Sequence, residues 1–559
     1  MTMEEQKAKF SFGEFLKKSW FYIGIFLLVS ISIIALMSDK DVQYSGEVVY
    51  EEPFYYITGN NLYMKVQGRD EVLLSSTMFK DPESRSKNDA MSAVFISEGG
   101  DYVYFYENIV LEEDGAIGDF CVFHDNRKKL IDEDTGLFFA IADDSDTVVY
   151  LKALYNVEGG SGYENVRYDL YKYNFKDGRK LVEKGVEPSW FTISGDGRSI
   201  IYTKLYDAAT DTSSLFINRD GNTVFVDDHM FFYGEYLPKG TFRVNWPYTN
   251  YDASKIVYGK RMKYGELVDL YVYSGGAPEL LGEDVLQVFC DESLDSVLFI
   301  ENYKNEVFLG DVSRVNLNTL SREAITTDAW GLGTTALARV FGPGFMELDI
   351  YFKDYNDVIN VADLCMMTPE GEKILINATE VSKIQFSENY DTLYGLDYYV
   401  PEEGGRLTKI VLGEGGTFEK YQYDEFVKEF YASESGIYVA YMQDKDLFYI
   451  DASNKKNYVD KLGVVTFGVM EGDEKLYFFK EASLGMGNVF VKDIKKSGDL
   501  TLIAEGAHYA WDYGDGKMAF LTNFDFGALT GTLYLTDCEG KYEIIAENME
   551  LPLYYNKIK

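Results

Sequence analysis

Apolar and polar positions alternate in short runs along most of the chain after residue 45. In Ser189–Asp207, an apolar run leads into Gly195-Asp196-Gly197, and the run "SIIYTK" follows that tight polar break. A second run, "SLFINRDG", comes after a polar stretch. Runs of about four to eight β-prone residues between Gly, Asp and Asn breaks are typical of short antiparallel strands joined by turns. The pattern therefore predicts an all-β protein.

The same order of runs and breaks recurs along the chain. It opens again in "SEGGDYVYFYEN", "DDSDTVVYLK", "DASKIVYGK", "SENYDTLYGL" and "DYGDGKMAFL", among other places. The mean spacing between openings is about 46 residues, and a period of about 40–50 residues with four short strands per unit is typical of a β-propeller. We therefore predict a β-propeller.

The number of units bears on how many rings the chain forms. About eleven units fit between residue 46 and the C-terminus, whereas a single propeller usually closes with about 4–8 blades. We therefore expect two tandem propellers, at 46–325 and 326–559. The boundary is placed in 312–345, where "AWGLGTTALARVFGPGF" lacks the repeat pattern. A single large ring with inserted hairpins is the alternative.

The repeat unit resembles the TolB-type and WD-like β-propeller family, and also the propeller half of prolyl-oligopeptidase-class proteins. The family pattern has an "SPDG" turn, an "I-x-[YF]" strand and then "LY-x-x-[DN]-x-x-G". The stretches "SGDGRSIIYTK" and "SLFINRDG" match it best, with Gly195 in place of the family's proline, while "LYVYSGG" and "LYLTDCEG" match its second half. The resemblance covers most of 45–550 and implies an architecture, because one fold hosts many functions.

The glycine-flanked aspartates are candidate site residues, and we interpret them as structural repeat turns. Gly195, Asp196 and Gly197 form one such turn, and Asp515 and Gly516 form a part of another. A ligand loop is expected in one or a few units, but a related turn precedes a strand in nearly every unit. We expect Asp196 to hydrogen-bond within its own turn and Gly195 or Gly197 to supply a positive φ.

An apolar segment near the N-terminus predicts a membrane anchor. Trp20–Met37 has no charged residue, and eighteen residues at about 1.5 Å each approach the ~30 Å hydrocarbon core. Lys17 and Lys18 precede it, so the positive-inside rule leaves residues 1–19 in the cytoplasm. We predict a single-pass protein of the cell membrane, with a linker at 38–45 and the bulk outside the cytoplasm. A cleaved signal peptide and a cytoplasmic bulk are the alternatives.

Charge and composition limit the classes of partner. The chain has 53 basic and 92 acidic residues and a formal net charge of −39. Such a field repels phosphate backbones, so we expect no nucleic-acid partner. The aromatic share of 16% fits a protein rich in pleated strands.

The sequence offers little that is typical of catalysis. No Gly-x-Ser-x-Gly elbow precedes a helical domain, and His124, His229 and His508 are far apart in sequence. Two alternatives stay open: a triad that assembles only in space, and a pair of carboxylates hidden among the many acids. We predict no catalytic residue and no cofactor.

Metal sites and disulfide bonds also lack the usual spacing. No two Cys or His residues lie at zinc-ligand spacing, and the acidic turn "DDSDT" departs from the calcium-loop pattern. We predict no metal site, with calcium as the lesser alternative, and no disulfide framework among the cysteines Cys121, Cys290, Cys365 and Cys538.

Tryptophans invite a sugar-binding interpretation, because their rings can stack on pyranoses. Trp190 and Trp511 both come shortly before a repeat turn, which favours packing between blades for these two; the others are Trp246 and Trp330.

These observations favour a non-catalytic module that binds or scaffolds protein or glycan partners through the propeller loops. Rigid blades with variable loops make such a platform. The alternative is a carbohydrate-active hydrolase that uses carboxylates in a propeller funnel.

The predicted topology can be tested on intact cells. Protease added outside should digest residues 46–559, because the bulk is expected to lie outside the membrane. Survival of this region, under conditions that cleave a known surface protein, would contradict the predicted orientation.

Overall fold

The structure is a computed structural model of the whole chain. It describes residues 48–557 with gaps at 51–52, 81–93, 98–100, 113–114, 144–145, 155–166, 187–189, 208, 232–246, 262–266, 292, 305, 333–348, 414–415, 462–463, 471, 473–474, 484–485, 496–499 and 551–555. The predicted membrane helix at 20–37 lies outside the described residues. Within the described part there is no helix long and apolar enough to cross a bilayer. The membrane anchor therefore stays a prediction.

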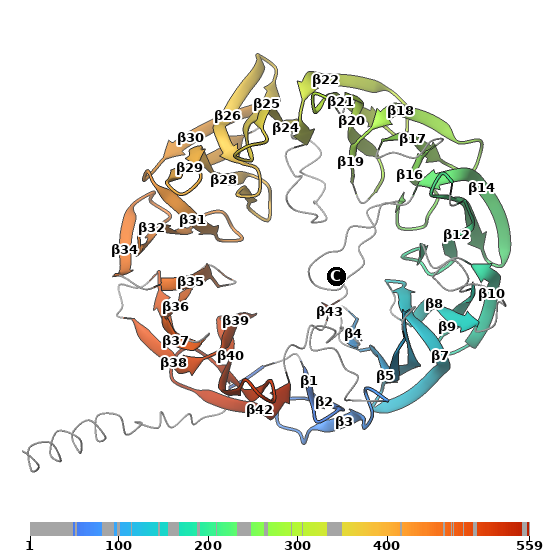
Figure 1. Cartoon of the computed structure of the whole chain (residues 1–559), viewed down its shortest axis with the longest axis horizontal. Helices are drawn as coiled ribbons and strands as arrows, with labels where there is room; N and C mark the ends of the chain where they lie inside the picture. Colours follow the sequence, from blue (N-terminus) through green and yellow to red (C-terminus); the bar gives the residue numbers. More distant parts are fainter. Residues whose placement is uncertain are drawn as a thin grey trace, which may run out of the picture.

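The described strands form eleven units, which we call blades 1 to 11 in chain order. Five sheets are single blades, and three sheets join two neighbouring blades each. Figure 1 shows the blades following one another around one ring, with the first strand of each blade toward the centre and the last at the periphery. The all-β propeller predicted from the repeat is thus the observed fold.

The first five blades have the following strands. Blade 1 has β1 (Phe54–Thr58), β2 (Asn61–Lys65) and β3 (Val72–Ser75); blade 2 has β4 (Val94–Ile96), β5 (Val103–Glu112), β6 (Gly115–His124) and the start of β7 (Arg127–Ile141); blade 3 has the end of β7, β8 (Thr147–Leu154), β9 (Arg167–Asn174) and β10 (Gly178–Val186); blade 4 has β11 (Phe191–Ile193), β12 (Ser199–Asp207), β13 (Thr212–Arg219) and β14 (Asn222–Phe231); blade 5 has β15 (Tyr248–Thr249), β16 (Ile256–Lys260), β17 (Val268–Tyr273) and β18 (Glu279–Val285).

The other six blades follow the same plan. Blade 6 has β19 (Gln287–Cys290), β20 (Ser296–Lys304), β21 (Leu309–Asn316) and β22 (Arg322–Ala329); blade 7 has β23 (Gly331–Leu332), β24 (Ile350–Asn356), β25 (Val361–Thr368) and β26 (Gly371–Glu380); blade 8 has β27 (Gln385–Phe386), β28 (Thr392–Val400), β29 (Gly404–Gly413) and β30 (Thr417–Gln422); blade 9 has β31 (Val427–Ala432), β32 (Val439–Gln443), β33 (Asp446–Ile450) and β34 (Lys456–Lys461); blade 10 has β35 (Val464–Val469), β36 (Lys475–Ser483), β37 (Met486–Asp493) and β38 (Thr501–Ala507); blade 11 has β39 (Tyr509–Gly514), β40 (Lys517–Asp525), β41 (Thr530–Thr536) and β42 (Tyr542–Glu550).

The expectation of two tandem propellers is wrong. The proposed boundary between residues 325 and 326 falls inside β22, and one apolar cluster joins Leu298 and Ile300 of blade 6 to Tyr351 and Cys365 of blade 7. A second cluster packs Phe54 of blade 1 against blade 11, so the first and last blades meet. The repeat pattern specifies each blade, but it does not specify the angle between neighbouring blades, which sets how many blades close a ring.

The two chain ends of the described region meet in the same part of the ring. Strand β43 (Asn556–Lys557) pairs in parallel with β4, where Phe95 faces Asn556. Figure 1 places β43 inside the ring beside β4. The two ends of the described chain are thus joined by two contacts: the apolar cluster between blades 1 and 11, and the parallel pairing of β43 with the inner strand of blade 2.

The second strand of each blade is covered on both sides by its neighbours. In β12 the first five residues are buried, and in β20 five of the first six are buried. These strands are nearly continuous apolar runs rather than alternating ones, as expected for a strand buried on both faces. Charged side chains at the ends of such strands consequently need partners from the adjacent blade.

A repeated polar contact supplies those partners, and we call it the interblade clamp. In its simplest form, Glu183 on the last strand of blade 3 accepts hydrogen bonds from Tyr202 Oη at 3.0 Å and Lys204 Nζ at 3.1 Å. Both donors lie on β12 of blade 4, two residues apart and therefore on one face. Burial opposes ionisation of Glu183, but the hydrogen bonds from Lys184, Lys204 and Tyr202 outweigh it and lower the pKa of this carboxyl.

The clamp recurs between other pairs of blades. Asp132 accepts from Tyr150 at 3.0 Å and Lys152 at 2.8 Å, Asp227 from Tyr258 at 2.6 Å and Lys260 at 2.7 Å, Asp424 from Tyr441 at 2.6 Å, and Asp460 from Lys480 at 2.9 Å. The recurring sequence is an aromatic residue, any residue and then Lys on the second strand, as in "YLK", "YTK", "YGK" and "FFK". The motif thus marks the second strand, and in these four blades it also supplies the Lys of the clamp. In blade 7, Tyr351 and Lys353 bind Glu372 of their own blade instead.

Replacing Asp132 by alanine tests the contribution of a clamp. Its side chain is only 5% exposed and pairs with both Lys152 and Arg179. Loss of one partner of a buried ion pair costs about 3–5 kcal/mol. Because both cations are partly exposed, we expect the free energy of unfolding to fall by about 2–3 kcal/mol in urea denaturation.

Glu370→Ala is the matched control, because the ion pair between Glu370 and Lys373 is exposed. The control should change the free energy of unfolding by less than about 0.5 kcal/mol. Equal effects of the two substitutions would show that the clamp does not stabilise the ring.

Candidate functional site

The first predicted site, Gly195-Asp196-Gly197, is a closed turn between β11 and β12. Asp196 Oδ1 accepts hydrogen bonds from Ser194 Oγ at 2.6 Å and from the Arg198 amide at 3.0 Å. Gly197 has a φ of 68°, in the left-handed region that favours glycine. Gly195 does not have a positive φ; a side chain there would overlap Asp143 and Tyr251 from the neighbouring turns. The hydrogen bonds of Asp196 and the two glycines therefore support the backbone conformation and close packing of the turn.

The second predicted site is a different turn. Asp515 and Gly516 have φ values of 50° and 69°, and they join Gly514 to Lys517 in a two-residue hairpin. Two consecutive positive φ angles are typical of a type I′ turn. The two predicted turns therefore lie at equivalent places in blades 4 and 11, but they have different conformations.

These turns bind one another around one face of the ring, which we call the turn face. The Asp143 amide donates to Gly195 O at 3.0 Å, and the next blades repeat the contact with side chains as donors. In these contacts Lys172 donates to Gly197 O at 2.6 Å, Arg219 to Ala253 O at 3.0 Å, Lys255 to Leu294 O at 2.8 Å, and Lys475 to Gly516 O at 3.3 Å. The predicted turn residues are thus occupied by blade-to-blade contacts.

The opposite end of each second strand leads into the hairpin to the third strand, and we call this side of the ring the loop face. Large apolar side chains are exposed there in at least five blades. Their exposed fractions are 66% for Leu205, 50% for Phe308, 86% for Val358, 60% for Tyr398 and 49% for Phe526. The two faces differ in degree: Tyr251, Leu320 and Ile437 are exposed at the turn face, whereas the loop-face hairpins carry more large exposed apolar side chains.

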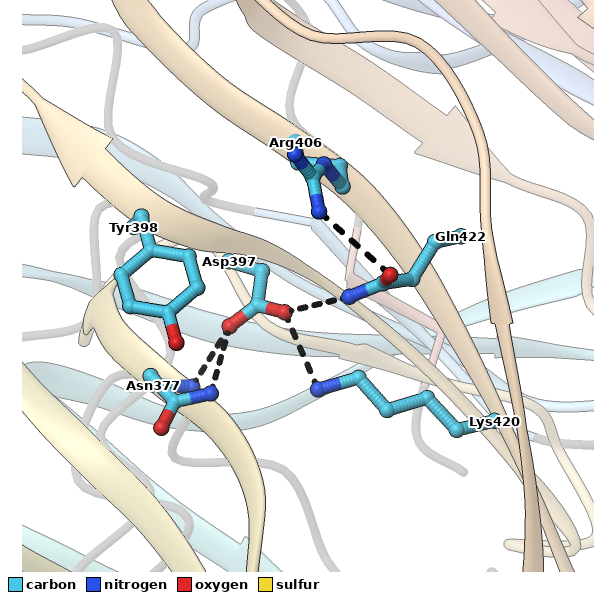
Figure 2. Close-up of a pocket in the computed structure, with 6 residues that line it drawn as sticks. All are labelled: Asn377, Asp397, Tyr398, Arg406, Lys420 and Gln422. Carbon is cyan, nitrogen blue, oxygen red and sulfur yellow. Dashed lines mark hydrogen bonds and ion pairs between the residues drawn. The ribbon is translucent and has the colours of Figure 1, made fainter.

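A pocket opens toward this loop face between blades 7 and 8. It has a volume of about 540 Å³ and is lined by Asn377, Asp397, Tyr398, Arg406, Lys420 and Gln422. Asn377 comes from β26 of blade 7, and the other five come from β28, β29 and β30 of blade 8. Figure 2 shows Asp397 at the centre, with the ring of Tyr398 on one side and Lys420 on the other.

Asp397 is fully buried, and both of its oxygens are occupied. Oδ1 accepts from the Asn377 amide at 2.8 Å and from Asn377 Nδ2 at 3.0 Å. Oδ2 accepts from Gln422 Nε2 at 2.9 Å and from Lys420 Nζ at 3.0 Å. Burial opposes ionisation of Asp397, but the bonds from Asn377 and Lys420 outweigh it and lower its pKa. The carboxylate therefore organises the pocket and is not poised to accept a proton.

The pocket replaces an interblade clamp. In the strand register, Gly395 and Asp397 occupy the positions on the second strand that hold Tyr and Lys in the clamped blades. Ile376, on the last strand of blade 7, occupies the position of the acid. A side chain at 395 would come within 2.6 Å of Ile376 Cδ1, so the apolar residue fills the space of the missing ring. The charge at the clamp position is reversed, and the carboxylate pairs with Lys420 of its own blade instead.

The histidines do not lie together. His124 stacks on Tyr102 with ring centroids 4.0 Å apart, and His508 stacks on Phe524 at 4.0 Å. His229 lies 3.4 Å from Thr212 on blade 4. The three residues belong to different parts of the ring, so the structure does not assemble a catalytic triad from them.

The cysteines and tryptophans serve packing or lie apart from the pocket. All four cysteines are described and have free thiols, and three of them are buried. Trp190 is buried in a cluster that joins blades 4 and 5, and Trp511 packs against the cluster that joins blades 11 and 1. Trp330 stacks on Tyr355 at 3.9 Å, and Trp246 lies outside the described residues.

Carboxylates in the described blades do not form a metal centre. No group of three or more His, Cys, Asp or Glu side chains with metal-binding geometry occurs among the described residues. Asp143 and Asp146, from the acidic turn considered for calcium, lie near blade-to-blade contacts: the Asp143 amide binds Gly195, and Asp146 accepts from Asn174 at 2.9 Å.

Comparisons with known proteins bear on the fold alone. No family model matches the chain, and no curated protein matches it. Among solved structures, the chain is similar to a eukaryotic initiation factor (10% identity, TM-score 0.38, 82% of this chain and 97% of that one). It is also similar to a prolyl endopeptidase (11% identity, TM-score 0.31, 79% of this chain and 55% of that one). A third similar structure is the β-propeller domain of the Trilobed protease from Pyrococcus furiosus (10% identity, TM-score 0.25, 81% of this chain and 96% of that one).

A prolyl endopeptidase and a protease β-propeller domain are thus among the structures that the chain is similar to. The assignment of the fold itself rests on the ring of sheets in Figure 1.

The pocket was not predicted from the sequence, although a signal was present. Aligning the units on their turns puts an acid, Asp397, at a position where five blades have Lys. Glu301 of blade 6 and Glu107 of blade 2 are two more such exceptions, and they pair with Arg322 and Lys128 of their own blades. A reversal of charge at a repeated position is visible without a structure, but its partners on other strands are not.

The pKa of Asp397 leads to a pH-dependent prediction. Because the pKa of Asp397 is lowered in the folded state, its ionised form stabilises the fold at pH values above the unfolded pKa of about 3.9. This stability is lost as the pH falls through the lower folded pKa. Asp397→Asn should therefore destabilise the ring at pH 7, and its difference from wild type should shrink below about pH 4. Urea denaturation at pH 7, 5, 4 and 3 measures this.

Asp357→Asn is the control, since Asp357 is exposed on the loop face. It should leave stability unchanged at each pH. A difference for Asp397→Asn that stays constant from pH 7 to 3 would show that the ionised carboxylate is not what stabilises the pocket.

Proposed function

We propose that this protein is a membrane-anchored, extracytoplasmic interaction platform that binds a protein partner through its loop face. The observation that carries the proposal is the difference between the two faces. Many groups of the turn face bind the next blade, whereas the loop-face hairpins expose large apolar side chains such as Val358 and Phe308. Large exposed apolar side chains are typical of interaction sites.

The apolar side chains are concentrated on consecutive blades. Blades 6, 7 and 8 carry Val307 and Phe308, Val358, and Tyr398 and Val400 in their hairpins. Neighbouring blades hold these hairpins at fixed separations, because the clamps and core clusters connect the blades. A rigid set of anchors limits the entropy lost on binding.

Acidic residues surround these anchors and indicate the chemistry of the partner. Asp357, Glu402 and Glu403 are exposed in the same hairpins, and the whole chain has a net charge of −39. Complementary charge speeds encounter and selects partners. The partner surface that fits best is apolar at its centre and basic at its rim.

The predicted helix at 20–37 would hold this platform at the membrane. Tethering raises the effective concentration of a binding surface toward partners in the same membrane or envelope. This favours a scaffolding role over a freely diffusing one.

Site-specific crosslinking in intact cells tests the loop face. A photoreactive residue at 358 should give a discrete crosslinked product. Phe308→Asp on the neighbouring blade should reduce its yield about tenfold, equivalent to about 1.4 kcal/mol. Phe308 has a φ of 57°, which Asp tolerates well, so the fold should not be affected.

Leu181→Asp is the control, because Leu181 is exposed on the outer strand of blade 3, away from the hairpins. It should leave the yield unchanged. No discrete product, or equal yields from both variants, would contradict a partner on the loop face.

A further inference from the structure

One residue of the pocket has an unfavourable backbone conformation. Tyr398 has a φ of 54°, directly after the clamp position, at a register shift between Asp397 and Val400. The same left-handed bulge follows the clamp position in other blades, where the residue is Asn108, Asn302, Asp354 or Asn523, and in blade 4 it is Leu205. Asn and Asp tolerate this conformation, whereas a bulky residue there is strained.

Strain of this kind persists where the side chain has a use. The ring of Tyr398 is 60% exposed, and its hydroxyl makes no hydrogen bond to the described residues, so packing does not account for it. Figure 2 shows the ring standing beside the polar groups that line the pocket. The bulge thus presents an aromatic ring at the mouth of the pocket.

Polar groups in the pocket keep unused hydrogen-bonding capacity. Lys420 Nζ binds Asp397 and has further protons to donate, and Arg406 contacts Gln422 Oε1 at 3.4 Å and Glu425. Asn377 uses both of its nitrogens toward Asp397, which leaves its carbonyl oxygen as an acceptor. The pocket therefore offers donors and acceptors side by side.

Charges around the pocket compensate one another. Lys420 is paired with Asp397, and Arg406 is paired with Glu425. An anionic ligand would need uncompensated cations, and a cationic ligand would need a free carboxylate. Neither is present among the residues that line the described pocket.

We propose that this pocket binds a neutral saccharide unit. Sugar hydroxyls donate and accept hydrogen bonds at once, and the C–H face of a pyranose packs on an exposed aromatic ring such as that of Tyr398. The volume of about 540 Å³ lies within the range of about 300–1,000 Å³ that small-molecule pockets have. The proposal names a ligand and does not depend on the protein partner of the loop face.

Saturation-transfer NMR tests the proposal on the full-length chain, in a detergent without a sugar headgroup. The probes are the methyl glycosides of glucose, galactose, mannose and N-acetylglucosamine, with glucuronate and inorganic phosphate as anions. At least one neutral glycoside should show saturation transfer, strongest at the protons of the face that packs on Tyr398. No transfer to any neutral glycoside would overturn the proposal, as would binding of the anions alone.

Tyr398→Asn separates binding from folding. Asn is the residue that other blades have at this bulge, so the thermal midpoint should stay the same or rise. Affinity for the bound glycoside should fall at least tenfold, because the stacking ring is gone. Undiminished binding by this folded variant would overturn the proposal.

Leu205→Asn is the matched control. Leu205 occupies the same left-handed bulge in blade 4, with a φ of 62° and 66% exposure. This variant should bind the glycoside as wild type does. An equal loss in both variants would show that the effect does not come from the pocket. Crosslinking at position 358 tests the protein partner, and glycoside binding tests the pocket. A negative result in one experiment therefore does not contradict the other proposal.

Discussion

The buried ends of the second strands impose the constraint on which the ring depends. Each of these strands is sandwiched between two blades, so a Lys and a Tyr at its end need an acceptor nearby, which the preceding blade supplies in several of the joins. Glu183 meets Tyr202 and Lys204 in this way, and Asp132 and Asp227 repeat the arrangement. Apolar packing brings the blades together without direction, whereas the clamp fixes their register, because its donors and acceptor have defined geometry. A closed ring of many blades needs both.

Blade 8 departs from the repeated contact at two neighbouring positions. At blade 8, Asp397 takes the position of Lys and forms the floor of a pocket with Lys420 and Gln422. In the next position Tyr398 takes the place of Asn or Asp and is exposed at the mouth. The clamped blades thus provide a rigid frame, and among the blades with an acid at this position blade 8 combines it with an exposed aromatic ring beside a pocket. The turn face has no such freedom, because its carbonyls bind the neighbouring blades.

Much of the fold could be predicted from the sequence because each blade is locally encoded. "SGDGRSIIYTK" specifies the turn at Asp196 and the strand after it, and both are present as the pattern implies. The number of rings could not be predicted, since the angle between blades arises from packing of whole sheets. The pocket could not be predicted either: Asn377 and Asp397 are 20 residues apart and meet only through the contact of two blades.

A double-mutant cycle on Glu183 and Lys204 tests the central claim most directly, namely that clamps couple neighbouring blades. The two side chains are 25% exposed each and 3.1 Å apart, and they come from blades 3 and 4. Urea denaturation of wild type, Glu183→Gln, Lys204→Met and the double variant gives the coupling. We predict a coupling energy of about 1 kcal/mol or more, as found for residues in one ion-pair network. Additivity within about 0.3 kcal/mol would contradict the claim.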